Sequence, residues 1–132
     1  MSRRPHFLQP LLKRASEGLV LRVEGRDVPV ATTVESAFDS TTRKRGLLGR
    51  DALSPDVAFV IAPCSGVHTF GMRFPIDLIF AARDGRVTKV RHSMPASRIS
   101  IGFGAFAVIE MAAGAVERAG VREGDQLVVG HA

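Results

Sequence analysis

The sequence predicts a mainly β domain of the α+β class. We expect an antiparallel, barrel-like sheet of about seven short strands, with one or two short helices at its edge. Short apolar runs rich in Val, Ile and Phe are separated by Gly- and Asp-containing turns, which favours strands joined by hairpins. Helix-like stretches are too few to connect most of the strands, as a parallel sheet would require.

The chain is long enough for one domain. It has 132 residues, of which 45% are hydrophobic and 23% charged, as in ordinary globular proteins with a single core. Residues 1–18 contain Pro5, Pro10 and several cations without hydrophobic periodicity, so we expect a flexible basic arm there. Residues 19–132 are expected to form a single β-rich domain.

Local signals define the first elements. Gly25 lies between two apolar runs and suits a hairpin reversal. Ser40 can cap the helix that follows, and Asp39 adds favourable negative charge at the same end. The next apolar run is nearly continuous, which favours a central strand buried on both faces. We therefore expect strands at 19–23 and 28–37, a helix at 41–48 with Leu47 and Leu48 towards the core and its cations towards water, and a strand at 57–62.

The second half of the chain begins with an irregular segment that is broken by Gly71 and Pro75. The pair Asp84-Gly85 between two apolar runs is a strong hairpin signal. Pro, Ser and Gly residues then indicate a long loop. The expected elements are an extended segment at 67–74, strands at 76–82 and 86–92, a loop at 94–104, a strand at 105–112, a short helix at 114–119 and a last strand at 126–129.

Charge and composition restrict the partners. The formal net charge is +5, and the positive balance comes from the arm and from the cluster Arg43-Lys44-Arg45 with Arg50. The chain has no Trp or Tyr, and most of its Phe residues are in apolar runs, so we expect no nucleic-acid partner. The single Cys excludes an internal disulfide, and no apolar run is long enough to span a membrane. SRRPHFLQ resembles a twin-arginine export signal, but the following PLLKRASEG lacks the apolar segment that such signals require. We expect a cytoplasmic protein.

The segment CSGVHTFGMRFPIDLIF, residues 64–80, concentrates distinctive chemistry. Cys64, His68 and Asp77 are the candidate catalytic residues, because a thiol, an imidazole and a carboxylate are the groups that acyl transfer requires. His68 and Asp77 with a third group could instead form an open metal site. No nucleophile-elbow, phosphate-cradling or closed metal motif surrounds them, so we assign no catalytic residue, no metal and no cofactor.

A binding pocket is the alternative use of these residues. We expect its lining to include His68, Phe70, Asp77 and Glu110. Strand alternation places Ile76, Leu78 and Phe80 on one face and Asp77 on the other, where a buried carboxylate needs several donors. We expect Asp77 to anchor the 67–74 segment or to form the polar floor of the pocket, while Glu110 within AVIEMA could be a second buried acid.

Several motifs in order resemble a known family. The chain is similar to the uncharacterised conserved family DUF192 in its residues His68-Thr69, Met72, Pro75–Phe80 and Asp84–Val87, in Arg43–Leu48, and in the later Val108–Glu110, Ala113-Gly114, Arg118, Gly120-Val121 and Gly124-Asp125. The resemblance spans about residues 30 to 130. It implies a compact β-rich domain of prokaryotic origin with no established activity. Other branches of the family carry Trp-Met-Lys-Asn-Thr in place of residues 68–72 but keep the Asp, which implies more weight for Asp77 than for His68.

These observations support one leading function and two alternatives. The leading hypothesis is a non-enzymatic binding module for a small polar or anionic ligand or a partner peptide. A hydrolase or metal-assisted enzyme centred on Cys64, His68 and Asp77 is the first alternative. The second is a structural or assembly partner that uses the basic arm.

Overall fold

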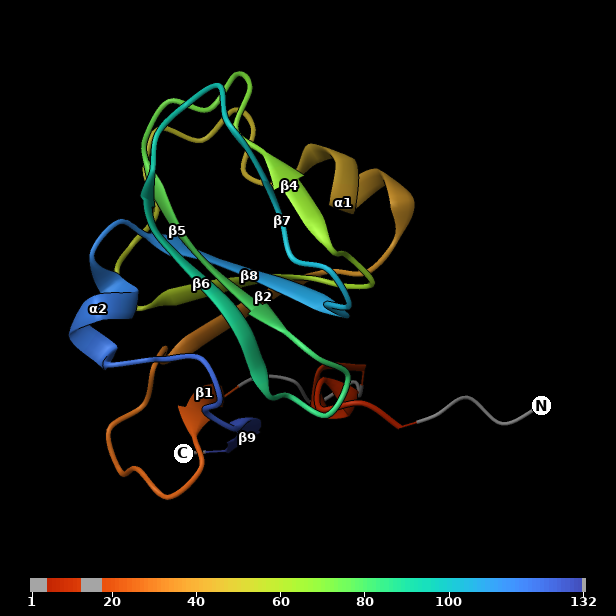
Figure 1. Ribbon diagram of the computed structural model, residues 1–132, viewed down its shortest axis with the longest axis vertical. Helices are drawn as coiled ribbons and strands as arrows, with labels where there is room; N and C mark the ends of the chain where they lie inside the picture. Colours follow the sequence, from red (N-terminus) through yellow and green to blue (C-terminus); the bar gives the residue numbers. More distant parts are fainter. Residues whose placement is uncertain (1–4, 13–17, 132) are drawn as a thin grey trace.

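The computed structural model describes residues 5–12 and 18–131, which form a mainly β fold with two short α-helices (Figure 1). A mixed sheet of five strands in the order β2-β3-β8-β5-β6 lies at the centre, and two two-stranded sheets, β1-β9 and β4-β7, lie beside it. The elements are η1 (Gln9–Leu12), β1 (Leu19–Val23), β2 (Thr33–Ala37), α1 (Ser40–Arg45), β3 (Val57–Ile61), β4 (Gly66–His68), β5 (Ile76–Ala81), β6 (Val87–Met94), β7 (Ile99–Ile101), β8 (Ala107–Ala112), α2 (Ala115–Ala119) and β9 (Leu127–His131).

The central sheet has an apolar core on each face. Strand β5 shows why, because its alternating side chains enter different cores: Leu78 and Phe80 pack on one face and Ile79 on the other. The Ile79 face is covered by β1-β9, η1 and α2, and the Leu78 face by β4-β7 and the chain after α1. Figure 1 shows β1-β9 and β4-β7 at opposite ends of the molecule.

The sheets are open and mixed, and the described residues form no closed barrel, which corrects the predicted architecture. The predicted first hairpin forms only in part. Strand β1 pairs with β9, and only the single bridge Leu21–Ala31 connects it towards β2. Strand β2 pairs in parallel with β3, because residues 38–56, including α1, provide the long crossover that a parallel pair needs.

Helix α1 begins one residue earlier and ends sooner than predicted. The carboxylate of Asp39 accepts a hydrogen bond from the backbone N–H of Thr42 at 2.8 Å, so Asp39 and not Ser40 is the N-cap. Gly46 ends the helix with a φ of 50°, a conformation that favours glycine. Leu47 is buried as predicted, whereas Leu48 is half-buried.

The long loop predicted at 94–104 contains a strand. Residues 99–101 form β7 and pair antiparallel with β4, so that His68 faces Ile99 and Gly66 faces Ile101. The hairpin across Asp84-Gly85 is confirmed by the antiparallel pairing of β5 and β6. Two segments that the sequence indicated as irregular therefore stabilise each other by long-range pairing.

Part of the predicted N-terminal arm packs on the domain. The side chain of Leu8 is fully buried, Leu11 is nearly so, and the backbone N–H of Phe7 donates to the carbonyl of Arg83 at 3.0 Å. Residues 1–4 and 13–17, which carry the rest of the predicted arm, lie outside the described residues. Within the described part of the chain, no helix is both long enough and apolar enough to cross a membrane.

Candidate functional site

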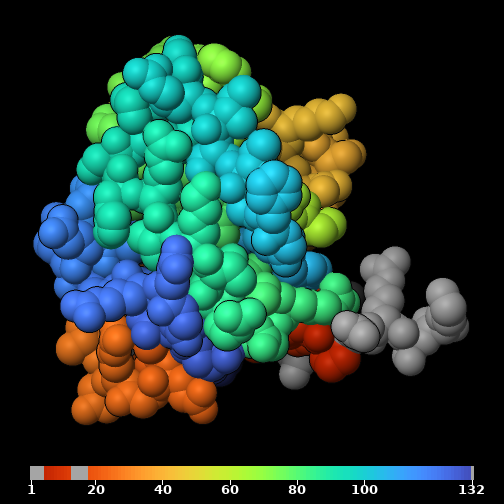
Figure 2. Space-filling model, in the orientation of Figure 1, coloured from red at the N-terminus to blue at the C-terminus, as the bar shows by residue number. Residues whose placement is uncertain are grey.

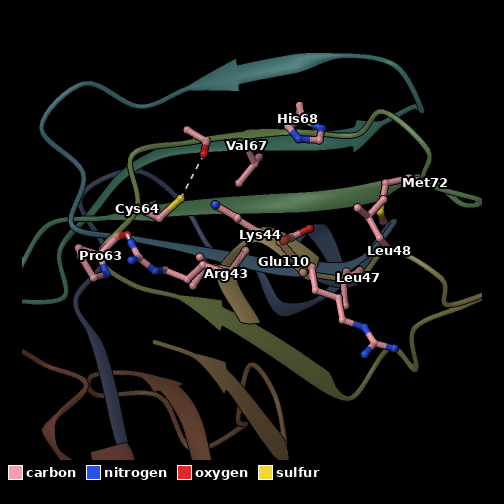
Figure 3. Close-up of a pocket in the computed structure, with 14 residues that line it drawn as sticks. Arg43, Lys44, Leu47, Leu48, Pro63, Cys64, Val67, His68, Met72 and Glu110 are labelled. Carbon is pink, nitrogen blue, oxygen red and sulfur yellow. Dashed lines mark hydrogen bonds between the residues drawn. The ribbon is translucent and has the colours of Figure 1, made fainter. Parts of the chain in front are cut away.

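A pocket of about 310 Å³ lies between helix α1, strand β8 and the segment from Pro63 to His68 (Figure 3). It brings together residues that are far apart in sequence, because β3 pairs with β8 and the crossover places α1 over their ends. Its lining residues are Arg43, Lys44, Arg45, Gly46, Leu47, Leu48, Ile61, Pro63, Cys64, Gly66, Val67, His68, Met72 and Glu110. We call this the α1 pocket.

Glu110 is the buried acid of the α1 pocket. It lies on β8 opposite Leu78, and only 5% of it is exposed. None of the hydrogen bonds formed by the described residues involves its carboxyl group, and burial raises its pKa to about 7, against the opposing influence of the Arg50 cation. One carboxyl oxygen lies 3.9 Å from the position that a Cβ on Gly46 would take. A carboxyl group next to a glycine and open to a cavity has room for a partner.

Three consecutive cations of α1 line the same pocket, namely Arg43, Lys44 and Arg45. The guanidinium of Arg43 donates to the carbonyl of Pro63 at 2.9 Å, which ties the helix to the opposite side of the pocket. Figure 3 shows the side chain of Lys44 extending into the pocket. The prediction that this cluster faces water holds for Lys44 and Arg45, which are exposed, while Arg43 is half-buried. All three also line the α1 pocket together with Glu110.

Cys64 lies in the pocket with its thiol already bonded. The thiol donates to the carbonyl of Gly66 at 3.1 Å. Burial raises the pKa of Cys64, the charge of Glu110 acts in the same direction, and the hydrogen bond with Gly66 and the Arg43 cation oppose them. A thiol that is held in its protonated form is a weak nucleophile.

His68 and Phe70 lie at the outer side of the pocket. His68 is exposed on β4 and reaches only the pocket rim, and its Nδ1 accepts from the backbone N–H of Phe70 at 3.3 Å. The ring of Phe70 contacts the ring of His68 with centroids 5.3 Å apart, but Phe70 is not part of the lining. Of the four residues predicted to line a binding pocket, Phe70 is therefore not among those that line the α1 pocket.

Asp77 is also absent from the pocket. It is fully buried on the opposite face of the sheet, and its carboxylate accepts three backbone N–H bonds, from Ser93 at 2.7 Å, Gly114 at 2.9 Å and Val116 at 3.0 Å. The cause is strand alternation, because Asp77 and Leu78 point to different faces and Glu110 is opposite Leu78. The carboxylate caps α2, whose own N-cap residue, Gly114, has no side chain to do so.

The segment predicted to depend on Asp77 is instead held by Thr69, a residue that the sequence interpretation missed. Its hydroxyl donates to the carbonyl of Pro95 at 2.6 Å and accepts from the backbone N–H of Arg98 at 2.9 Å. The backbone N–H of Thr69 also donates to the carbonyl of Arg98 at 2.8 Å. These partners lie more than twenty-five residues away, so no local pattern could reveal them.

The predicted catalytic group is consequently not assembled. Cys64 and His68 belong to the α1 pocket, whereas Asp77 is saturated with backbone donors elsewhere. Across residues 5–12 and 18–131, no three His, Cys, Asp or Glu side chains cluster as metal ligands would. The geometry that remains is a pocket with a cationic side, a thiol and a buried acid.

Comparisons with known proteins give the family. Two solved structures share the fold with a TM-score of 0.72 each. One is a protein of unknown function from Novosphingobium aromaticivorans DSM 12444, 22% identical, with 82% of each chain covered. The other, from Sinorhizobium meliloti 1021, is described as a "putative transcription regulator" and is 27% identical, with 83% of this chain and 89% of that chain covered. No curated protein matches. The family model DUF192, described as an uncharacterized ACR, matches residues 20–129, and the chain therefore belongs to this family.

Proposed function

We propose that the protein is a binding module whose α1 pocket holds a small ligand with two features. An anionic group of the ligand contacts the cations of α1, and a hydrogen-bond donor of the ligand, such as an ammonium or hydroxyl group, reaches Glu110. The observation that carries the proposal is the buried carboxyl group of Glu110, which has no hydrogen bond from the described residues and opens into the pocket.

A buried acid without a partner costs free energy, because desolvation is not offset by a hydrogen bond. A hydrogen-bond donor of the ligand that reaches Glu110 offsets this desolvation cost, and it can do so without a change in the fold. The pKa of about 7 means that the group is ionised in a large fraction of molecules at neutral pH. Glu110 can therefore accept hydrogen bonds from a cationic group at physiological pH.

The cationic side supports an anionic group on the same ligand. Arg43, Lys44 and Arg45 lie in the last turn of α1 and line the pocket together. Each of them adds positive charge to this part of the pocket lining, which favours an anionic group on the ligand. A zwitterionic or hydroxylated anion can contact both the cations of α1 and the carboxyl group of Glu110, whereas a simple anion can contact only the cations.

Enzymatic alternatives receive less support from the geometry. Acyl transfer would need an orienting carboxylate beside His68, and Asp77 is on the other face of the sheet. Burial also raises the pKa of Cys64, which lowers its nucleophilicity at neutral pH. We therefore place binding before catalysis.

Calorimetric titration with a matched set of probes tests the proposal. Aminoalkanesulfonates carry both groups, alkanesulfonates of the same length carry only the anion, and alkylamines carry only the donor. We expect the aminoalkanesulfonates to bind most tightly. The variant Glu110→Gln should remove most of the advantage of the amino group, and Arg43→Ala with Lys44→Ala should remove that of the sulfonate.

Exposed residues outside the pocket provide the controls. Glu117→Gln on α2 removes an acid, as Glu110→Gln does, and Arg122→Gln removes a cation, as the α1 variants do. Both variants should leave the affinities for all three probe classes unchanged. The proposal is wrong if the three probe classes bind equally, or if Glu117→Gln weakens binding as much as Glu110→Gln does. Folding of each variant is checked by its thermal midpoint.

A further inference from the structure

An apolar surface lies on the outward face of the β4-β7 ribbon. Ile99 and Ile101 are 60% and 48% exposed, while Ser100 between them is buried, so both Ile side chains point outward. Across the ribbon, Ile99 faces His68, whose ring contacts the 49% exposed Phe70. We call the set formed by Phe70, Ile99, Ile101 and Phe103 the ribbon patch.

Phe103 follows Ile101 by two residues and lies at the tip of a tight turn. The backbone N–H of Ala105 donates to the carbonyl of Gly102 at 3.0 Å, and Gly104 has a φ of 79°, as the third position of a type II turn requires. Phe103 is 91% exposed. A Cβ on Gly102 would collide with the ring of Phe80 in the core. The turn therefore packs closely on the sheet, and this packing fixes the backbone that carries Phe103.

The segment that carries three of the four patch residues has charge of one sign. Residues 85–109 contain no Asp or Glu, and their cations are Arg86, Lys89, Arg91 and Arg98. The ammonium group of Lys89 donates to the carbonyl of Ile101 at 2.8 Å, and Arg98 directly precedes Ile99. Figure 2 shows this segment, coloured teal to cyan, over much of the upper front face of the molecule.

We propose that the ribbon patch docks on an anionic lipid surface. Aliphatic and aromatic side chains that insert at the headgroup level, flanked by cations and free of acids in the same segment, are the combination that binds such a surface. The aliphatic side chains favour lipid over single-stranded nucleic acid, because Ile cannot stack on bases as an aromatic ring does. This binding is peripheral, goes beyond the proposed pocket function and is independent of it.

Vesicle co-sedimentation tests the proposal. The full chain is mixed with vesicles of phosphatidylcholine alone or with phosphatidylserine added, at low and high salt. We expect binding only to the anionic vesicles, weakened by salt. Phe103→Ser should lower the partition coefficient by about tenfold. Lys89→Gln and Arg98→Gln should each lower it by about fivefold.

Val28→Ser is the matched control, because Val28 is 79% exposed in the connection between β1 and β2. Figure 1 shows this connection at the other end of the molecule from β4-β7. It should leave the partition coefficient unchanged. Equal binding to both vesicle types, no binding to either, or equal loss in Val28→Ser would each overturn the proposal. The proposal would also be overturned if Phe103→Ser abolished a dimer of the protein, or a complex with oligothymidylate, and left vesicle binding intact.

Discussion

Replacing Asp77 by Ala should be among the most destabilising single changes in this chain. The substitution leaves three backbone N–H groups without their acceptor, those of Ser93, Gly114 and Val116. Each hydrogen bond to a charged group contributes about 1.5–3 kcal/mol. The three share one carboxylate and water can enter the space that the side chain leaves, so the contributions do not add fully. We expect a loss of about 3–5 kcal/mol in the free energy of unfolding.

Urea denaturation of matched variants measures this loss. Cys64→Ser changes one atom of a half-buried side chain and should cost about 1 kcal/mol or less. Asp84→Ala removes a single exposed hydrogen bond to the N–H of Arg86 and should cost less than about 1 kcal/mol. Because Asp77 is outside the α1 pocket, the folded Asp77→Ala protein should bind pocket ligands with unchanged affinity. If Asp77→Ala is no more destabilising than Cys64→Ser, the three N–H groups do not depend on this carboxylate.

Three further predictions concern Glu110, Thr69 and Cys64. The pKa of Glu110 is raised from 4.5 to about 7 on folding, so the folded state binds more protons than the unfolded state between these pH values. The free energy of unfolding should therefore fall by up to about 3 kcal/mol as pH rises from 4.5 to 7, and then level off. Urea titrations at several pH values measure this dependence, which Glu110→Gln should remove. Thr69→Val keeps the shape of the side chain but leaves the backbone N–H of Arg98 without its acceptor, so the free energy of unfolding should fall by about 2 kcal/mol. Amide hydrogen exchange should become faster around residue 98, while the amides of β8 stay protected. Cys64 should react with iodoacetamide more slowly than a free thiol at pH 8, because burial raises its pKa; a faster reaction would contradict that environment.

Much of the secondary structure could be predicted from local signals. The alternation in IDLIFA correctly separates Asp77 and Ile79 from Leu78 and Phe80, and Asp84-Gly85 correctly indicates the β5-β6 hairpin. The first predicted hairpin did not form as a paired ladder, because β1 pairs with β9 at the other end of the chain. Glycine at a reversal permits a hairpin, but only long-range packing decides whether the strands pair.

The candidate site could be predicted only in part. Cys64, His68 and Glu110 meet at the α1 pocket as lining residues, although His68 reaches only the rim. The cations of α1 were missed, because nothing near residues 43–45 shows that the crossover folds them over β8. Asp77 was correctly expected to be buried and bonded to several donors, but its donors come from β6 and α2, and it lies on the face away from the pocket.

Titration of the Glu110 carboxyl carbon by nuclear magnetic resonance measures whether this group is the acid that binds the ligand. The signal is assigned with Glu110→Gln and followed over pH with and without an aminoalkanesulfonate. We predict a midpoint about 7 in the free protein, and a lower midpoint with the ligand because its ammonium group stabilises the ionised carboxylate. An alkanesulfonate without the amino group should not lower it. A midpoint near 4.5 in the free protein, or a midpoint that the bound aminoalkanesulfonate does not change, would contradict Glu110 as the ligand-binding acid.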